Sequence, residues 1–391
     1  MNIKLIPTGK VISTILKHDA KITSYKIALL RAINDVALSF SHLANHDKDV
    51  AIPLRMLAEF WVAYYWPFVE QSNPIAQGPR AKLGEKIRND MAFRPFLTSL
   101  RLQWENDLKI VSRPSDGFFI INELRIPRRR DSYSNELLNI YKHTLTSISN
   151  TLEMPIPYAG PGNWTVFAKP TKYSSLCETV VPIPGTRSID KCLVIRAALW
   201  QTFYELSLWI EALCIHEWCL FTENVEQESR ESTDRGDIYR LLTDRPDNRR
   251  PLTWERNNVD LLLIEGNEFV CPWTETRICK GVNYDMDHLI PVSVYPINEL
   301  WNLVPADPYF NSYVKRNYLP SSERLQQASS YLEFAYKQYG LSKRLSLALR
   351  EDVAIRFSTV QYNDVSFPHE VAGAVVNLIE RVAESRNITR F

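Results

Sequence analysis

Apolar residues in the first part of the chain recur mostly at intervals of three or four, which is the period of an amphipathic helix. This pattern predicts a helix within residues 22–43. Residues 54–66 are apolar on nearly every side and predict a second helix that lies inside a helical layer. A third helix is expected at 93–108, whereas residues 117–121 follow a Pro-Ser-Asp-Gly turn and predict a strand. The first part of the chain is therefore expected to be mostly helical with a small sheet.

The middle of the chain divides into a long helix and a charged segment. The apolar run at 193–221 predicts the helix, and residues 222–258, which are dense in charges of both signs, are interpreted as a solvated linker. The helical pattern returns from Ser322 onward. We therefore expect a mainly helical regulatory, partner-binding or DNA-binding region at 1–221, the linker, and a second domain at 259–391.

The composition is that of an ordinary globular protein. Of 391 residues, 45% are apolar and 23% are charged, and the length favours two or three domains. The 46 basic and 45 acidic residues leave a net charge of +1, which alone does not suggest a nucleic-acid partner. Glycines number only 12 and no GxGxxG occurs, which argues against a dinucleotide-binding fold or a nucleotide-driven motor.

The cysteines and the apolar segments indicate a cytoplasmic protein without membrane insertion. None of the six cysteines forms a CxxC pair, so the thiols are expected to be reduced and no thioredoxin-type motif is present. The N-terminus lacks the sustained apolar run of a signal peptide. The apolar segments at 54–69 and 193–221 contain charged residues and fall short of the roughly 20 apolar residues that span a bilayer.

The candidate chemistry lies in residues 271–321. An aspartate-histidine pair is followed by a proline, an asparagine within Trp-Asn-Leu, a second asparagine, a lysine and Leu-Pro-Ser. These residues are Asp287, His288, Pro291, Asn302, Asn311, Lys315 and Leu319–Ser321. One Asp-His pair means little, but the ordered set resembles the HNH endonucleases, most closely the HNH domain of RNA-guided CRISPR effectors and of standalone HNH proteins. The resemblance covers about 60 residues and implies metal-assisted cleavage of phosphodiester bonds.

The residue types suit that chemistry. Phosphodiester hydrolysis needs an activated water and a group that takes up negative charge on the phosphate. An imidazole accepts protons near neutral pH, so His288 is the candidate general base. Mg2+ prefers oxygen ligands, which Asp287 and the side-chain carbonyl of Asn311 would supply, and Mn2+ is expected to substitute for it.

The resemblance also implies a fold. HNH proteins use a ββα-metal hairpin, and residues 269–271 and 284–290 are expected to pair as its strands, with the helix at 308–316. Many HNH proteins carry two CxxC pairs around the hairpin and bind structural zinc. This chain has only Cys271 and Cys279, so no structural zinc is expected and the two thiols are interpreted as buried packing residues.

Three further residues receive roles from the resemblance. Asn302 would hold the imidazole in orientation, and its alternative is an ordinary turn residue. Lys315 and Arg316 would contact the phosphate backbone of the substrate, and the alternative for Lys315 is a solvated helix lysine. Three residues separate Asn311 from Lys315, which leaves the helical register open by one position.

Charge is distributed unevenly along the chain, although the net charge of the whole chain is close to zero. Residues 260–309 contain two basic and eight acidic residues, a net charge of −6, whereas residues 310–350 contain seven basic and two acidic residues, a net charge of +5. An acidic metal-binding hairpin followed by a basic helical tail suits a phosphate backbone. Arg125 and residues 128–130 form a second basic cluster, which is either a DNA contact or a solvated loop.

We therefore expect an α+β protein in which a large, mainly helical N-terminal part precedes a ββα-metal HNH nuclease domain with C-terminal helices. Its expected function is Mg2+-dependent hydrolysis of DNA, and one active centre per monomer predicts nicking. Standalone HNH proteins of this type resemble nucleases of bacterial restriction and anti-phage defence, Zorya-type systems among them, which implies a protein partner that activates or recruits the nuclease. The alternatives are a nucleic-acid-binding or adaptor protein with an inactive hairpin, and a nuclease that acts on RNA.

Overall fold

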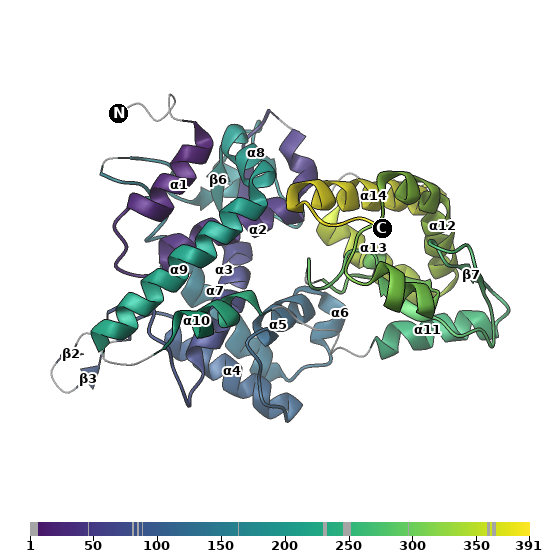
Figure 1. Ribbon diagram of the computed structural model, residues 1–391, viewed down its shortest axis with the longest axis horizontal. Helices are drawn as coiled ribbons and strands as arrows, with labels where there is room; N and C mark the ends of the chain where they lie inside the picture. The colour runs from purple at the N-terminus through teal and green to yellow at the C-terminus, as the bar shows by residue number, and fades with distance from the viewer. Residues whose placement is uncertain are drawn as a thin grey trace. The chain divides into compact units, whose positions relative to one another are not determined.

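The computed structural model shows an α+β protein of two compact units, residues 1–245 (unit 1) and residues 246–391 (unit 2) (Figure 1). The described residues are 7–45, 47–79, 82–83, 86–87, 89–162, 164–229, 233–244, 252–295, 297–357, 360–361 and 365–391. The division falls within the segment interpreted as a linker. Helices nevertheless occupy much of the described part of that segment, so it is not a simple solvated loop.

Unit 1 is mostly helical. Its helices are α1 (Thr8–His18), α2 (Tyr25–Ser39), η2 (Ser41–Asn45), α3 (Leu54–Tyr65), η3 (Trp66–Val69), α4 (Arg94–Leu108), α5 (Asp116–Arg125), α6 (Pro127–Arg130), α7 (Asn135–Leu152), η4 (Tyr173–Ser175), α8 (Ala197–Glu205), α9 (Ser207–Ser229) and α10 (Arg235–Thr243). Its strands are β1 (Val50–Pro53), β2 (Lys82–Leu83), β3 (Lys86–Ile87), β4 (Thr171–Lys172), β5 (Val181–Pro182) and β6 (Lys191–Ile195). Strands β4, β6, β1 and β5 form one sheet in that order, and β2 pairs with β3.

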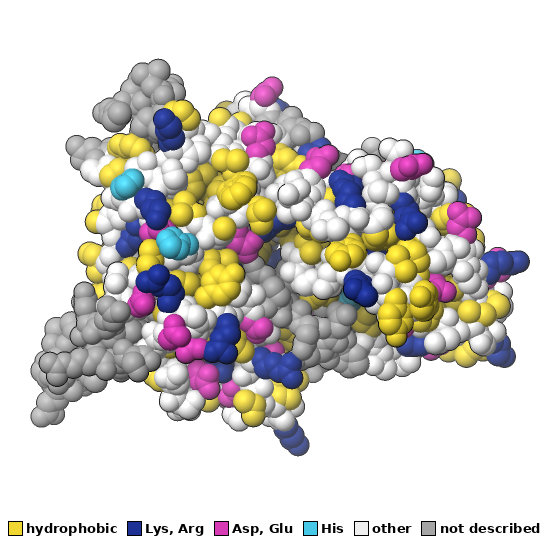
Figure 2. Space-filling view, viewed as in Figure 1, with side chains coloured by type: hydrophobic (Ala, Val, Ile, Leu, Met, Phe, Trp, Pro, Cys, Tyr) yellow, Lys and Arg dark blue, Asp and Glu magenta, His cyan; other side chains and the backbone are white. Residues whose placement is uncertain are grey.

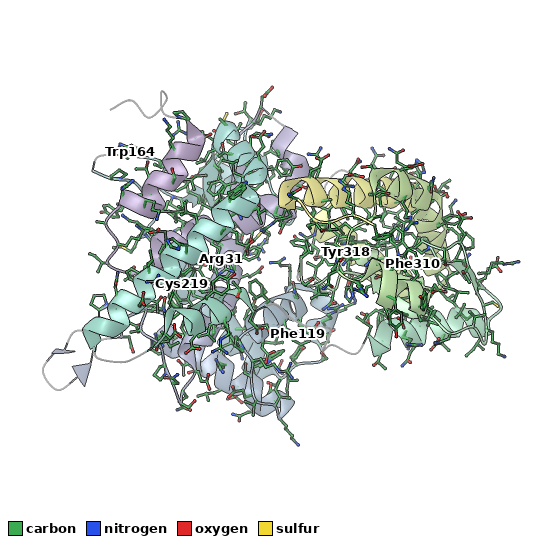
Figure 3. The ribbon with its side chains drawn as sticks, viewed as in Figure 1. Arg31, Phe119, Trp164, Cys219, Phe310 and Tyr318 are labelled. Carbon is green, nitrogen blue, oxygen red and sulfur yellow. The ribbon has the colours of Figure 1, made fainter. Side chains whose placement is uncertain are left out.

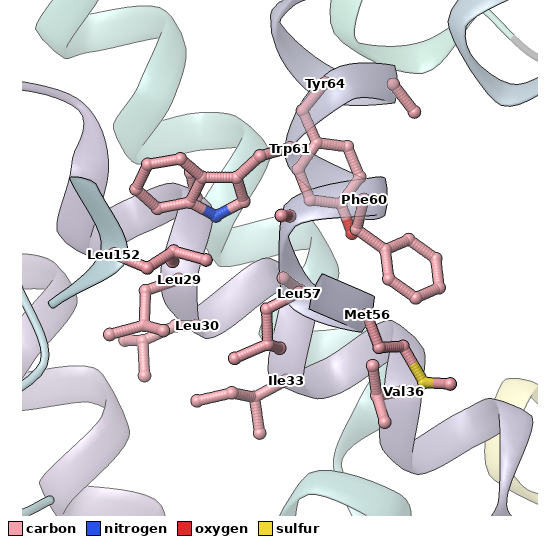
Figure 4. Close-up of a cluster of buried hydrophobic side chains, with 14 of the residues drawn as sticks. Leu29, Leu30, Ile33, Val36, Met56, Leu57, Phe60, Trp61, Tyr64 and Leu152 are labelled. Carbon is pink, nitrogen blue, oxygen red and sulfur yellow. The ribbon is translucent and has the colours of Figure 1, made fainter. Parts of the chain in front are cut away.

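The core of unit 1 is built around α2 and α3. Figure 4 shows Leu29, Leu30, Ile33 and Val36 of α2 beside Met56, Leu57, Phe60, Trp61 and Tyr64 of α3. Almost every residue of α3 is buried, which confirms the helix predicted at 54–66 and its enclosed position. Helix α5 packs closely on α3 and η3, because a Cβ on Gly117 would lie 2.8 Å from the Ala63 Cα of α3 and 2.6 Å from the Trp66 Cβ of η3. Glycine is therefore required at that contact.

Two predictions for unit 1 are wrong. Residues 117–121 belong to helix α5 instead of a strand, since a short apolar run suits a buried helix as well as a buried strand. The run at 193–221 begins in strand β6, which pairs antiparallel with β1, and is then divided at Leu206 into α8 and α9. Residues 191–195 form a strand because they pair with β1, which is distant in the sequence. The local pattern of residues does not reveal this pairing.

Unit 2 surrounds two short hairpins with helices. Its elements are α11 (Thr253–Ile264), β7 (Phe269–Val270), β8 (Arg277–Ile278), β9 (Asp285–His288), η5 (Leu300–Asn302), β10 (Leu303–Ala306), η6 (Phe310–Lys315), α12 (Ser322–Leu341), α13 (Lys343–Arg356) and α14 (Phe367–Arg386). Strand β7 pairs with β8, and β9 pairs antiparallel with β10. The expected pairing of 269–271 with 284–290 is therefore wrong, whereas the helix predicted from Ser322 is confirmed.

Helices α12 and α13 fix the β9–β10 hairpin through buried polar contacts. The Tyr336 hydroxyl of α12 donates to the Trp301 carbonyl at 2.6 Å, and the Tyr339 hydroxyl donates to the Leu303 carbonyl at 2.7 Å. Arg356 of α13 forms a buried ion pair with Glu299, just before η5. Because buried polar groups are costly to leave unpaired, these contacts set the position of the hairpin.

The helices of the described residues do not include one with the length and apolar character needed to cross a bilayer.

Candidate functional site

Strand β9, strand β10 and helix η6 follow one another in the chain and carry the predicted site residues. His288 ends β9 and lies opposite Leu303, the first residue of β10. Side chains alternate along a strand, so Asp285 and Asp287 lie on one face of β9 and His288 on the other. The Asn311 side-chain amide of η6 donates to Asp285 Oδ2 at 3.2 Å, which joins the helix to the aspartate face.

The Asp287 carboxylate is buried and both of its oxygens have partners. Lys315 Nζ lies 2.9 Å from Oδ1, and the indole N–H of Trp273, from the turn between β7 and β8, donates to Oδ2 at 2.9 Å. The side chains of Asp287 and Lys315 are only 3% and 1% exposed. Lys315 Nζ also donates to the His288 carbonyl at 2.7 Å. Lys315 is thus an internal partner of Asp287, an arrangement that differs from both the phosphate contact and the solvated lysine considered for it.

The imidazole of His288 is held by a residue that sequence reasoning missed. His288 Nε2 lies 2.8 Å from Asn298 Oδ1, and both side chains are buried. With Nε2 donating to that oxygen, the lone pair of the neutral ring is on Nδ1. Asn298 carries no motif signal, and only its position four residues before Asn302 could have drawn attention to it.

Asn302 holds the backbone that follows His288. Its side-chain amide donates to the Ile290 carbonyl at 3.0 Å and accepts from the Ile290 N–H at 2.8 Å. Its own carbonyl accepts from the Leu289 N–H at 2.8 Å. The direct contact with the imidazole, expected of Asn302, is therefore made by Asn298, and Asn302 positions the loop instead.

Helix η6 is a π-helix, and its geometry settles the register between Asn311 and Lys315. The Arg316 N–H donates to the Asn311 carbonyl five residues back, at 2.9 Å. This wide turn brings both Asn311 and Lys315 to the aspartates of β9. Arg316, the next residue, is exposed and has a positive φ of 47°.

The side chains around η6 fit a hard cation only in part. Asp285, Asp287 and Asn311 offer the carboxylate and amide oxygens that Mg2+ prefers. The ammonium of Lys315 already neutralises Asp287, so a cation bound there would have to displace it. In the part of the chain that the structure describes, no cluster of three or more histidine, cysteine or acidic side chains could hold a metal.

The cysteines of unit 2 are not a buried pair. Cys271 is buried and its Sγ accepts from the Asp307 N–H at 3.3 Å, whereas Cys279 is exposed. The packing role expected for both thiols is therefore correct only for Cys271.

Residues 6–242 match the family described as Domain of unknown function (DUF8808), which is more than half of the chain. The chain belongs to the DUF8808 family. Neither a curated protein nor a solved structure matches the chain. The DUF8808 region lies within unit 1, and the candidate site lies in unit 2.

The basic cluster of the DUF8808 region is largely engaged in internal ion pairs. Arg125 lies 2.8 Å from Glu59, and Arg129 forms a buried pair with Glu123 at 2.7 Å. Arg130 donates to backbone carbonyls of α5. These contacts show a structural role for the cluster, which differs from both the DNA contact and the solvated loop considered for it.

Proposed function

We propose that the chain is a Mg2+-dependent endonuclease of the HNH type that hydrolyses phosphodiester bonds in DNA. One observation carries the proposal. The Asp287-His288 pair ends one strand, its antiparallel partner begins directly after Asn302, and the following helix brings Asn311 to the first strand. This order of strand, strand and helix supports the proposal, because the resemblance implies a ββα hairpin, although the strands that pair are not the expected 269–271 and 284–290.

Each residue has a chemical task in this proposal. The Nδ1 lone pair of His288 takes a proton from the attacking water, while Asn298 fixes the ring through Nε2. Asn302 positions the loop that follows the histidine. Asp287 and Asn311 would hold Mg2+, which when bound would neutralise charge on the phosphate, and Mn2+ would serve in its place.

The outer side of η6 offers a surface that suits nucleic acid. Tyr309 and Tyr313 are 69% and 63% exposed, and their ring centroids lie 5.1 Å apart. Figure 3 labels Phe310 and Tyr318 among the side chains of unit 2, and Figure 2 shows hydrophobic side chains with lysine or arginine beside them on the visible face of that unit. Exposed aromatic rings stack on bases and the exposed Arg316 would contact phosphate, which supports a nucleic-acid partner.

A plasmid assay tests the proposal. Supercoiled plasmid is incubated with the full chain and Mg2+, Mn2+ or EDTA, and nicked and linear forms are separated on a gel. We expect the nicked form with either metal and none with EDTA. His288→Ala should abolish nicking, whereas His369→Ala, which removes only an exposed surface pair with Glu333, should leave it unchanged. Nicking by His288→Ala at the wild-type rate would contradict the assignment.

A nucleic-acid-binding or adaptor protein with an inactive hairpin is the second candidate. The Asp287–Lys315 ion pair favours it, because a carboxylate already neutralised by lysine is a poorer metal ligand. Binding of DNA without cleavage at any Mg2+ or Mn2+ concentration would select this candidate. The same assay with a folded RNA separates a DNA nuclease from one that acts on RNA.

The setting of this activity rests on the resemblance of the motif alone. We propose that it operates in the cytoplasm, in bacterial restriction or anti-phage defence, and that the DUF8808 region docks an activating protein partner. Cleavage by residues 246–391 with the same rate and selectivity as the full chain would argue against a regulatory role for unit 1.

A further inference from the structure

The charged groups of the candidate site are enclosed by the protein. The side chains of Asp287 and Lys315 are only 3% and 1% exposed, and His288 is buried as well. In the proposed hydrolysis, a metal ion has to reach the Asp287 carboxylate and a phosphate has to reach the imidazole of His288. The observed arrangement is therefore a closed form of the site.

The Lys315 ammonium lies between two oxygens that would suit a metal ion. Its Nζ is 2.9 Å from Asp287 Oδ1 and donates to the His288 carbonyl at 2.7 Å. Carboxylate and backbone carbonyl oxygens are both ligands of hard cations in proteins. The other carboxylate oxygen, Oδ2, accepts from the Trp273 indole at 2.9 Å. Oδ1 is therefore the oxygen for which a metal ion and the ammonium would compete.

The wide turn of η6 sets the position of this ammonium. Lys315 is the last residue of the π-helix, and the Arg316 N–H closes the turn on the Asn311 carbonyl. Arg316 has φ 47° and ψ −123°, which is unfavourable for a residue with a side chain. The closed form thus combines a buried ion pair with a strained helix end. Loss of the ion pair would remove one of the contacts that hold this strain in place.

The residues next to Lys315 leave it a short path to solvent. Residues 312–314 and 316–318 are exposed, so Lys315 is the buried exception within an exposed stretch. A change in the last turn of η6 would move the ammonium into solvent without unpacking a buried neighbour of the same stretch. Strained segments that can adopt a second arrangement are often switches in proteins.

We propose that Lys315 is an internal cation that keeps the candidate site closed, and that the site opens when its ammonium gives way to a divalent cation at Asp287 Oδ1 and the His288 carbonyl. The inference rests on the proposed function and adds the regulation of the same site. In the open form, Lys315 joins Arg316 on the exposed part of η6, where both side chains would contact substrate phosphate. Metal binding and phosphate binding then favour the same form.

Mn2+ binding to the full chain tests the competition. Electron paramagnetic resonance counts the free ion, so the measurement does not depend on cleavage. Lys315→Met removes the ammonium and should bind Mn2+ roughly tenfold more tightly than the wild type, because the ion no longer has to break a buried pair. Asp287→Asn combined with Lys315→Met should lose this binding. Lys280→Met removes an exposed ammonium from unit 2 and, as the matched control, should bind like the wild type.

Hydrogen exchange of the wild type tests the movement of η6 and does not require a variant to fold. The Arg316 N–H donates to the Asn311 carbonyl, and the Tyr318 N–H donates to the Lys315 carbonyl. With saturating Mn2+, these two amides should exchange about tenfold faster, because the turn that protects them opens. The amides of α3 in unit 1 should keep their rates.

Two results would overturn the inference while leaving the metal site intact. Equal Mn2+ affinity of Lys315→Met and the wild type would show that the ammonium does not compete. Mn2+ bound to the wild type without faster exchange at Arg316 would show that η6 stays closed. An absence of Mn2+ binding from both proteins would instead contradict the metal site of the proposed function, and the inference would fall with it.

Discussion

Lys315→Met tests the internal charge balance of the candidate site. Methionine has a similar length but no charge, so the substitution removes the ammonium from Asp287 and from the His288 carbonyl. Among the described residues, the Asp287 carboxylate, 3% exposed, would keep only the Trp273 indole as a partner. The variant therefore leaves a buried negative charge without compensation.

The expected cost follows from the burial of the pair. Removal of one member of a buried ion pair costs about 3–5 kcal/mol, which is a large part of the roughly 5–15 kcal/mol that stabilises a typical domain. For a unit of this size the melting temperature should fall by about 10 °C. Asp287→Asn combined with Lys315→Met removes both charges and should recover most of the loss, because two neutral side chains of similar volume replace the pair.

Calorimetry of the full chain, with Mg2+ or with EDTA, measures these effects. Lys337→Met is the matched control, since its lysine forms an exposed pair with Glu333 on one helix face and should change stability by less than about 0.5 kcal/mol. If Asp287 binds Mg2+, the cation should restore part of the stability of Lys315→Met but not of the double variant. A Lys315→Met protein as stable as the control would refute the reasoning from burial.

Three further predictions concern the site residues and the thiols. Asn298→Ala should lower the turnover of plasmid nicking at least tenfold with little change in KM, because it frees the His288 ring without removing a DNA contact. Arg316→Gly should raise the free energy of unfolding by about 1 kcal/mol, because glycine tolerates the positive φ, yet weaken DNA binding in fluorescence anisotropy. Iodoacetamide at pH 8 should modify Cys177 and Cys279 first, as mass spectrometry would show. Both are exposed, and a hydrogen bond from a neighbouring threonine lowers the pKa of the Cys177 thiol.

The pattern of apolar residues predicted correctly the long helices, in which the pattern extends over many residues. The helix at 54–66 is a long run that is apolar on nearly every side, and the helix from Ser322 has apolar positions that repeat with a helical period. Short apolar runs were less informative. Residues 117–121 and 191–195 have similar content, but the first packs as a helix on α3 and the second pairs with β1. Tertiary contacts, which the local pattern does not contain, decided between them.

In the candidate site, too, the sequence predicted the order of the motif residues along the chain but not their side-chain partners. In the structure Asp287 lies on strand β9, Asn302 ends η5 directly before strand β10, and Asn311 lies on helix η6. The identity of the imidazole partner did not follow from the motif, because Asn298 reaches His288 through the path of a loop. The burial of Lys315 was also unexpected, since only the wide turn of η6 directs its ammonium towards β9.

Lys315 connects Asp287 and His288 of the candidate site to the backbone of η6. Its ammonium is shared by Asp287 Oδ1 and the His288 carbonyl, at the end of a π-turn that the Arg316 N–H closes on Asn311. Arg316 has φ 47° and ψ −123°, which a residue with a side chain adopts only where its surroundings hold it. The two contacts of Lys315 contribute to that restraint, together with the backbone hydrogen bonds from Arg316 to Asn311 and from Tyr318 to Lys315. A cation that displaced the ammonium from Asp287 would release the end of the helix as well, so metal binding and the position of the proposed phosphate contact at Arg316 would be coupled through one side chain.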